Sequence, residues 1–149
     1  MDDISRNRAI NTLSKIPVFA GLQTTEYQQV LGICTIAHYR AGDVIFKENA
    51  PSMAMYVQLS GETELQTASS GSVYIMKSGD LFGEIGVICH SNRTTSAVIG
   101  EDSVLLELAK DKFDFLQGKT PLIMAKILRN VAKVLAERLI SSGQHRYIL

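Results

Sequence analysis

The chain has 149 residues, of which 46% are hydrophobic and 20% are charged. This composition suits one globular domain with a single core and excludes an extended disordered chain. Lys plus Arg and Asp plus Glu are equal at 15 each, so no general charge favours nucleic acid or an anionic membrane. The N-terminal segment lacks the apolar run of a signal peptide, and no stretch reaches 18 apolar residues, so we expect a cytoplasmic chain that spans no membrane.

The cysteines and histidines give no sign of metal or nucleophile chemistry. Cys34 and Cys89 sit in apolar surroundings without metal-ligand spacing, so both are predicted to be buried free thiols. The three histidines, His38, His90 and His145, lie far apart and form no closely spaced pair, so we expect no metal site. The sequence therefore predicts no metal, no cofactor and no catalytic residue.

The N-terminal third begins with helical patterns. Residues 5–16 carry apolar side chains at helical spacing, at Ala9, Ile10, Leu13 and Ile16. Pro17 and Gly21 interrupt this pattern. Thr25 and Gln28 have the spacing of a capping box, which predicts a second helix over residues 25–34.

From residue 35 the pattern changes to short runs rich in β-branched and aromatic residues. Each run is closed by Gly, Asn, Pro or Ser, and the predicted strands fall at 37–42, 43–49, 53–61, 62–68, 72–79, 94–100 and 103–109. Regular short strands with such punctuation are typical of an all-β barrel or sandwich.

The last part of the chain returns to helical spacing. Asp111 is a candidate cap for a helix over 112–119, and Thr120 followed by Pro121 is a typical helix start. The helix over 122–142 would be about 30 Å long. Its apolar stripe comprises Ile127, Leu128, Val131, Val134, Leu135 and Leu139. One small barrel cannot cover a stripe of that length, so a homodimer through this helix is a candidate assembly.

The segment over residues 80–98 combines the groups that a nucleotide needs. Gly83 and Gly86 allow a tight bend whose free N–H groups would point at an anion. Glu84 can accept hydrogen bonds from sugar hydroxyls, and Arg93 offers a planar fork that fits two phosphate oxygens. Thr94 and Thr95 add hydroxyl donors. An exposed salt bridge between Glu84 and Arg93 is the alternative interpretation, and the neighbouring glycines and threonines argue against it.

This segment, "FGEIGVICHSNRTTSAV", resembles the phosphate-binding cassette of cyclic-nucleotide-binding domains. The resemblance extends to "IPVFAGL", to "YRAGDVIFKENAPSMAMYVQLSGETEL" with Gly42 and Gly61 at turn positions, and to the C-terminal helix. It implies a mainly β fold with flanking α-helices: a β-roll, similar to a jelly roll, with a long C-terminal lid helix. The implied layout is one domain over 1–149, with N-terminal helices at 1–34, the β-roll at 35–110, the cassette at 81–98 and C-terminal helices at 111–149.

The resemblance also implies the roles of individual residues. Glu84 would hold the ribose 2′-hydroxyl and Arg93 the cyclic phosphate, while Gly83, Ile85, Gly86, Thr94 and Thr95 would complete the anion cup. The base would lie against Val73, Leu81 and the lid helix. Arg138 would reach the base from that helix, and Arg129 is the alternative residue for this role.

The expected function is non-catalytic, regulatory binding of a cyclic nucleotide, with cAMP favoured over cGMP. Two alternatives stay open: a sensor fragment of a larger transcription factor, channel or kinase, and a degenerate domain with an empty pocket that serves as an interaction module. Similar bacterial sensors continue into a helix-turn-helix, which is not present up to Leu149, so no nucleic-acid partner is expected.

Overall fold

The computed structural model describes residues 2–69, 71 and 73–143. The chain divides into two compact units: residues 1–29 with 116–149, and residues 30–115. The predicted single domain over 1–149 stays a prediction, as do its internal boundaries.

The first unit begins with helices whose ends follow from local hydrogen bonds. Helix α1 spans Asp3–Ser14, and the side chain of Asp2 caps it by accepting from the N–H of Ser5 at 2.6 Å. A 3₁₀ turn, η1, spans Pro17–Phe19, and helix α2 spans Thr24–Ile33. The predicted capping box at Thr25 and Gln28 is wrong. Instead, the Glu26 carboxylate accepts from the N–H of Gln23 at 2.8 Å, because the helix begins earlier than predicted.

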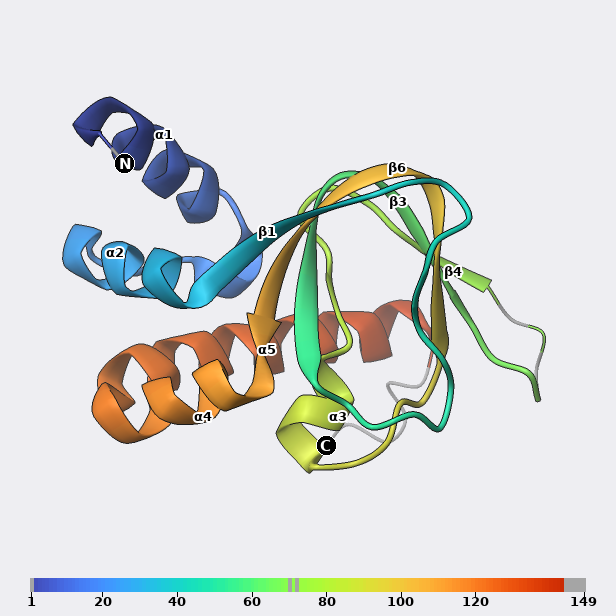
Figure 1. The fold of residues 1–149 in the computed structure, drawn as a ribbon. Coiled ribbons are helices and arrows are strands. Elements are labelled where there is room, and N and C mark those ends of the chain that lie inside the picture. Colours follow the sequence, from blue (N-terminus) through green and yellow to red (C-terminus); the bar gives the residue numbers. More distant parts are fainter. Residues whose placement is uncertain (1, 70, 72, 144–149) are drawn as a thin grey trace. The chain divides into compact units, whose positions relative to one another are not determined.

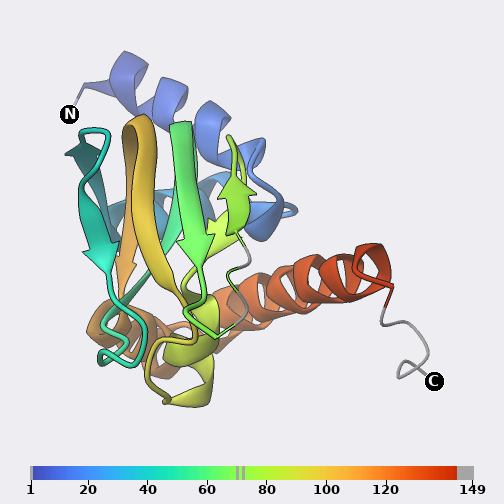
Figure 2. The same cartoon turned by 90° about the vertical axis from the view of Figure 1, so that its right-hand side faces the viewer.

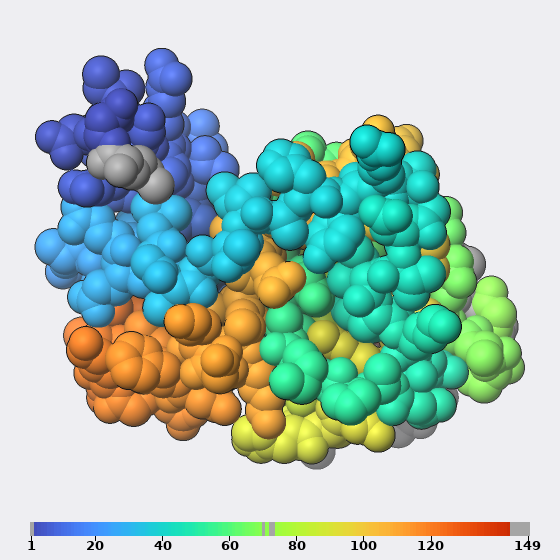
Figure 3. All heavy atoms as spheres, viewed as in Figure 1, coloured from blue at the N-terminus to red at the C-terminus, as the bar shows by residue number. Residues whose placement is uncertain are grey.

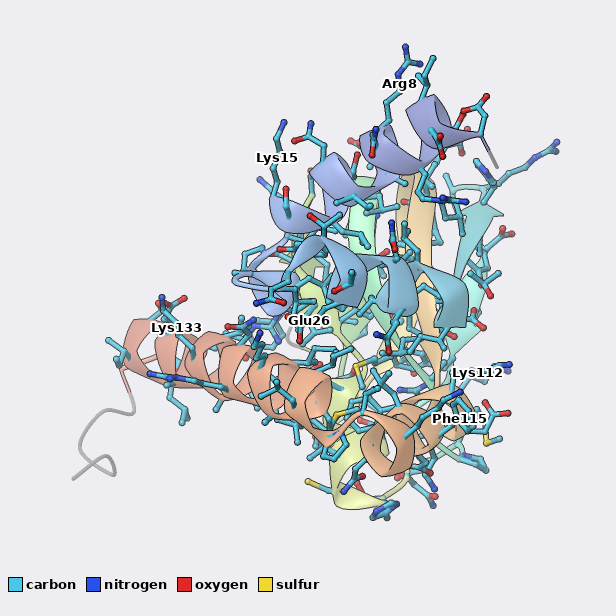
Figure 4. All side chains as sticks on the ribbon, turned by 90° about the vertical axis from the view of Figure 1, so that its left-hand side faces the viewer. Arg8, Lys15, Glu26, Lys112, Phe115 and Lys133 are labelled. Atoms are coloured by element: carbon cyan, nitrogen blue, oxygen red, sulfur yellow. The ribbon has the colours of Figure 1, made fainter. Side chains whose placement is uncertain are left out.

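Helix α5 spans Pro121–Ser141, with Thr120 at its N-cap and Pro121 in its first turn, as predicted. Two polar contacts tie α5 to the N-terminal segment of the same unit. The amide of Asn130 donates to the carbonyls of Val18 and Ala20 at 3.0 and 2.9 Å. Lys126 forms a 2.6 Å ion pair with Glu26, which lies on α2 beside α5 in Figure 4.

The apolar stripe of α5 is buried toward the start of the helix and becomes exposed toward its end. The buried side chains on this helix are Ile123, Met124, Ile127 and Val131. Leu135 is half-buried, whereas Leu139 and Ile140 are exposed. The candidate homodimer through this helix stays a prediction.

The second unit is a six-stranded antiparallel sheet that is curled into a roll (Figures 1 and 2). Its strands are β1 (Cys34–Tyr39), β2 (Val44–Phe46), β3 (Ala54–Gln66), β4 (Val73–Met76), β5 (Leu81–Phe82) and β6 (Ser96–Ala109). The order along the main path is β1-β6-β3-β4, with β2 paired to β6 and β5 paired to β3. Short helix α3 (Glu84–Cys89) follows β5, and α4 (Lys110–Lys119) follows β6.

Two strands are longer than predicted. The runs 53–61 and 62–68 form one strand, β3, and the runs 94–100 and 103–109 form one strand, β6. The predicted turn at Gly61 is therefore wrong, because Gly61 lies inside β3, where the register with β6 shifts. Its φ of +77° and the nearby backbone of Asp102 explain why glycine is needed there: a Cβ would lie 2.9 Å from the carbonyl carbon of Asp102 and closer to its oxygen.

The core of this unit lies between the curled strands. Its buried residues are Ala54, Tyr56, Phe82, Ala97, Ile99 and Leu105. Partly buried side chains pack against them from Tyr39, Ile45, Phe46, Leu65 and Met76. In Figure 3 the teal atoms of the segment that contains β2 form much of the visible face of this unit.

The predictions for the cap of α4 and for Cys89 are wrong, and the position of His145 is untested. Asp111 is the second residue of α4 and not its cap, because the helix already begins at Lys110. Cys89 is exposed at the end of α3 and is not the buried thiol that was predicted; Cys34 is half-buried, and burial raises its pKa to about 12. His145 and the rest of the segment 144–149 lie outside the described residues.

Candidate anion-binding site in the second unit

The turn between β5 and α3 places Gly83 at the centre of the predicted site. Gly83 is the N-cap of α3 and has a left-handed backbone, with φ of +75°. A Cβ there would lie 2.8 Å from Nη1 of Arg93 and 3.4 Å from the ring of Phe46. Glycine is therefore required twice, once for the backbone angle and once for the space.

The first turn of α3 is tied to the β2–β3 connection by a second glycine. A Cβ on Gly86 would lie 2.8 Å from the carbonyl oxygen of Ser91 and closer still to the Ser52 side chain. The Ser52 hydroxyl donates to that same Ser91 carbonyl at 2.7 Å, and the Ser91 N–H donates to Gly86 O at 3.0 Å. This close packing holds the start of α3, and with it Glu84, in one position.

Glu84 and Arg93 are both buried charged residues. Glu84 is only 3% exposed and Arg93 5% exposed. Burying a charged group is energetically unfavourable, and proteins keep buried charges mainly where these have partners or a function. An exposed surface ion pair, the alternative interpretation from the sequence, is therefore wrong for these two residues.

The guanidinium of Arg93 is held by the protein's own backbone. Nη1 donates to the carbonyl of Gly83 at 2.8 Å, and Nη2 donates to the carbonyl of Ala54 at 2.6 Å. Cζ lies 3.9 Å from the centroid of the Phe46 ring. Nε is buried and has no hydrogen-bond partner among the described residues. A buried donor in that state is costly, and an oxygen acceptor from a ligand would satisfy it.

The electrostatics keep Arg93 positively charged. Burial lowers the pKa of its guanidinium, while Tyr56 and Glu84 act in the opposite direction. Arginine ordinarily titrates far above neutral pH, so the group remains a cation at physiological pH. The result is a positive charge, held in place and largely shielded from water, next to the start of α3.

The loop after α3 is also fixed by the backbone. The N–H of Arg93 donates to the carbonyl of Ala50 at 2.8 Å, and the N–H of Asn49 donates to the carbonyl of Arg93 at 2.9 Å. Thr94 is exposed and Thr95 is half-buried, while Ile85 on α3 is exposed. These three residues are accessible to a ligand at the surface.

The predicted base-binding residues are placed less completely. Leu81 is buried on β5, two residues before Gly83. Val73 begins β4, opposite Gln66, and its side chain is not among those described. Arg138 lies in the last turn of α5, and Arg129 lies earlier on the same helix. Both belong to the other unit. Their predicted roles at the base stay predictions.

Three contributors to the site were missed from the sequence: the Phe46 ring, the Ser52 hydroxyl and the Ala54 carbonyl. Ser52 and Ala54 each lie 39 residues before their partners in the chain, and Phe46 lies 47 residues before Arg93. Phe46 had the appearance of an ordinary strand residue, and a backbone carbonyl has no signature in the sequence at all. No cluster of three or more His, Cys, Asp or Glu side chains that could hold a metal is found in the described part of the chain.

The fold defines a class: an antiparallel β-roll that carries a short helix after β5 and a buried arginine. Comparison with known proteins agrees. The family model described as "Cyclic nucleotide-binding domain" matches residues 36–119, more than half of the chain. The chain belongs to the cyclic nucleotide-binding domain family. This family consists of regulatory binding domains that are usually non-catalytic.

Individual relatives support the assignment. The chain is 31% identical over 127 residues to a cyclic AMP receptor protein of Thermus thermophilus, covering 83% of this chain and 57% of that protein. It is 30% identical over 115 residues to a cAMP-dependent protein kinase regulatory subunit of Aspergillus fumigatus, covering 76% of this chain and 28% of that protein. The crystal structure of the Thermus thermophilus catabolite activator protein superposes with a TM-score of 0.73 at 28% identity, covering 89% of this chain and 62% of that one.

These matches confirm the predicted family and the β-roll with flanking helices. The chain spans less than two thirds of the length of each of these relatives. No helix among the described residues combines the length and the apolar character that crossing a membrane requires.

Proposed function

We propose that the chain is a non-catalytic regulatory domain that binds a cyclic nucleotide, with cAMP favoured over cGMP. The observation that carries this proposal is the Arg93 guanidinium, which is 5% exposed and cationic and has a buried Nε–H without a partner in the described structure. A cyclic phosphate is an anion with exocyclic oxygens that can accept from such a donor.

The roles proposed for the other site residues are those that the family resemblance implies. Glu84, buried at the start of α3, is the acceptor for the ribose 2′-hydroxyl. The backbone N–H groups of Gly83, Ile85 and Gly86, with Thr94 and Thr95, surround the phosphate. The base-binding roles of Val73, Leu81 and Arg138 are proposed from the resemblance alone.

The preference for cAMP is supported by the relatives. One is a cyclic AMP receptor protein and another is a cAMP-dependent kinase regulatory subunit. Thr94, next to the arginine, could instead accept a hydrogen bond from the 2-amino group of a guanine in the syn conformation, so the preference rests on similarity and requires a direct test.

The test is isothermal titration calorimetry of the purified chain with cAMP and with cGMP under identical salt conditions. We expect a saturable single-site isotherm for cAMP and weaker binding of cGMP. A cGMP affinity tenfold above that for cAMP would reverse the nucleotide preference. The absence of binding of either nucleotide would favour the interaction-module alternative.

A second copy of the chain is the proposed protein partner. On α5, Leu135 is half-buried while Leu139 and Ile140 are exposed, so the far end of the helix presents apolar surface. Pairing of two such helices would remove that surface from water. In this proposal the ligand stabilises the C-terminal turns of α5 and thereby shifts the helix pair, to the extent that it binds the two arrangements with different affinity.

A further inference from the structure

The aromatic ring of Phe46 occupies a position that regular strand geometry would not produce. Strand β2 pairs with β6 through Val44 opposite Val98 and Phe46 opposite Ala97, so two steps along β2 match one step along β6. This is a β-bulge at Ile45. Bulges redirect the side chains that follow them. As a result, Ile45 and Phe46, which would point to opposite faces of a regular strand, both pack against the core.

The redirected ring lies against the guanidinium of Arg93. Cζ of Arg93 is 3.9 Å from the ring centroid, well within the range of a cation–π contact. The ring is itself supported by other aromatic rings, with centroids of Tyr56 and Phe82 at 6.1 and 6.3 Å. Phe46 is half-buried and belongs to a group of three aromatic rings, which limits the positions that its ring can take.

The guanidinium of Arg93 is held by two hydrogen bonds to carbonyls and one contact with an aromatic ring. The carbonyls of Gly83 and Ala54 hold Nη1 and Nη2 through hydrogen bonds. These two bonds fix the far end of the group. The ring of Phe46 covers its face, which leaves the Nε–H as the buried donor without a partner among the described residues.

We propose that Phe46 is a positioning residue for Arg93: its ring sets the plane of the guanidinium before ligand arrives, so that Nε is presented to the anionic oxygens of the ligand. This inference rests on the proposed function, because it concerns how the same site takes a cyclic phosphate. Binding then does not have to order a long, flexible side chain, and that ordering otherwise weakens affinity. The cation–π contact is also stronger in a desolvated site than at a surface.

The first experiment needs no ligand. Aromatic rings shift the NMR signals of protons above their faces upfield, so the Nε–H proton of Arg93, which has no hydrogen-bond partner among the described residues, should resonate upfield of that of the exposed Arg40. Phe46→Leu should remove this shift, whereas Phe46→Tyr, which keeps a ring, should retain it. Tyr39→Leu is the matched control, because it removes a ring that packs against the same core and has no contact with Arg93 among those described.

The second experiment measures the dissociation constant for cAMP in the same variants. Ordering one long side chain corresponds to a factor of roughly 2 to 10 in Kd, so Phe46→Leu should weaken binding by about fivefold. Phe46→Tyr should bind within about twofold of the unmodified chain, and so should Tyr39→Leu. Thermal unfolding of all variants shows how much of any change is loss of stability.

The outcomes separate this inference from the proposed function. If the unmodified chain shows upfield Arg93 signals but binds neither cAMP nor cGMP, the proposed function fails and Phe46 positions nothing for a ligand. If cAMP binds but Phe46→Leu and Tyr39→Leu weaken it equally, Phe46 is only a core residue and the inference is overturned. If Phe46→Leu does not fold, Phe46→Met provides the same comparison. If the Nε–H of Arg93 shows no upfield shift relative to that of Arg40 in the unmodified chain, the proposed positioning role of Phe46 is refuted by that result alone.

Discussion

Replacement of Arg93 by leucine is the most direct test of the site. In the structure this side chain supplies two hydrogen bonds to backbone carbonyls, one contact with an aromatic ring and one buried N–H that has no partner among the described residues. Loss of one member of a buried, hydrogen-bonded charge pair typically costs about 2–5 kcal/mol of binding free energy. With about 1.4 kcal/mol for each factor of ten, Arg93→Leu should raise the Kd for cAMP by roughly thirtyfold or more.

The same substitution has a smaller effect on stability, because its contributions oppose each other. The carbonyls of Gly83 and Ala54 lose their donors, which is destabilising at about 1–3 kcal/mol for a buried group left unsatisfied. In return, a buried cation and an unpartnered Nε disappear, and leucine can pack on Phe46. We therefore expect a folded protein whose Tm falls by several degrees.

Calorimetry gives the Kd, and differential scanning calorimetry gives the Tm. Arg40→Leu is the matched control, because Arg40 is exposed and lies in the same unit. Arg93→Lys keeps the charge but loses the planar fork, so its affinity for cAMP should lie between that of the unmodified chain and that of Arg93→Leu. Equal cAMP affinity in Arg93→Leu and the unmodified chain would refute the assignment of the phosphate to Arg93.

Four further predictions concern other parts of the molecule. Glu84 should make 2′-deoxy-cAMP bind at least tenfold worse than cAMP, about the 1.4 kcal/mol of one hydrogen bond to a charge, and Glu84→Ala should erase that difference in competition binding. Gly86→Ala should lower both Tm and cAMP affinity, because its Cβ would collide with Ser52 and the Ser91 carbonyl; unchanged values would contradict the close packing. The hydrogen-bonded ion pair with Lys126 and the hydrogen bond from the Gln23 N–H lower the pKa of Glu26. The stability that this ion pair contributes is therefore present above the usual glutamate pKa of about 4.3 and is lost as pH falls through the lowered pKa. The difference in Tm between the unmodified chain and Lys126→Met should shrink in that acid range, and a difference that stays constant with pH would contradict this role of the ion pair. Leu135→Glu should lower the mass seen by light scattering, and hydrogen exchange over residues 130–143 should slow when cAMP is added; a strict monomer without ligand-dependent protection would contradict the dimer proposal.

Much of the candidate site could be read from the sequence, because its main parts are local. Gly83, Glu84 and Gly86 belong to one turn and the first turn of one short helix, and Arg93 follows that helix directly. A left-handed N-cap requires glycine, and a helix start exposes N–H groups, so residue types at fixed spacing carried the information. The start of α5 at Thr120–Pro121 was predictable for the same reason.

The lengths of the strands could not be read in this way. Gly61 has the local signature of a turn, yet it lies within β3, because pairing with β6 continues on both sides of it. Whether a glycine ends a strand or forms an irregularity inside one depends on the partner strand, which is distant in the sequence. The same applies to Cys89, whose apolar neighbours suggested burial although it ends a short surface helix.

The family, the cassette and the two charged residues of the candidate site can all be inferred from the amino-acid sequence. The way Arg93 is held becomes visible only in the folded chain: its guanidinium bonds the Ala54 carbonyl, 39 residues earlier in the chain, and contacts the Phe46 ring, which a bulge in β2 redirects toward it. The difference arises because spacing within one turn fixes local backbone geometry, whereas contacts between distant segments form only when the strands that carry them pair in a particular register.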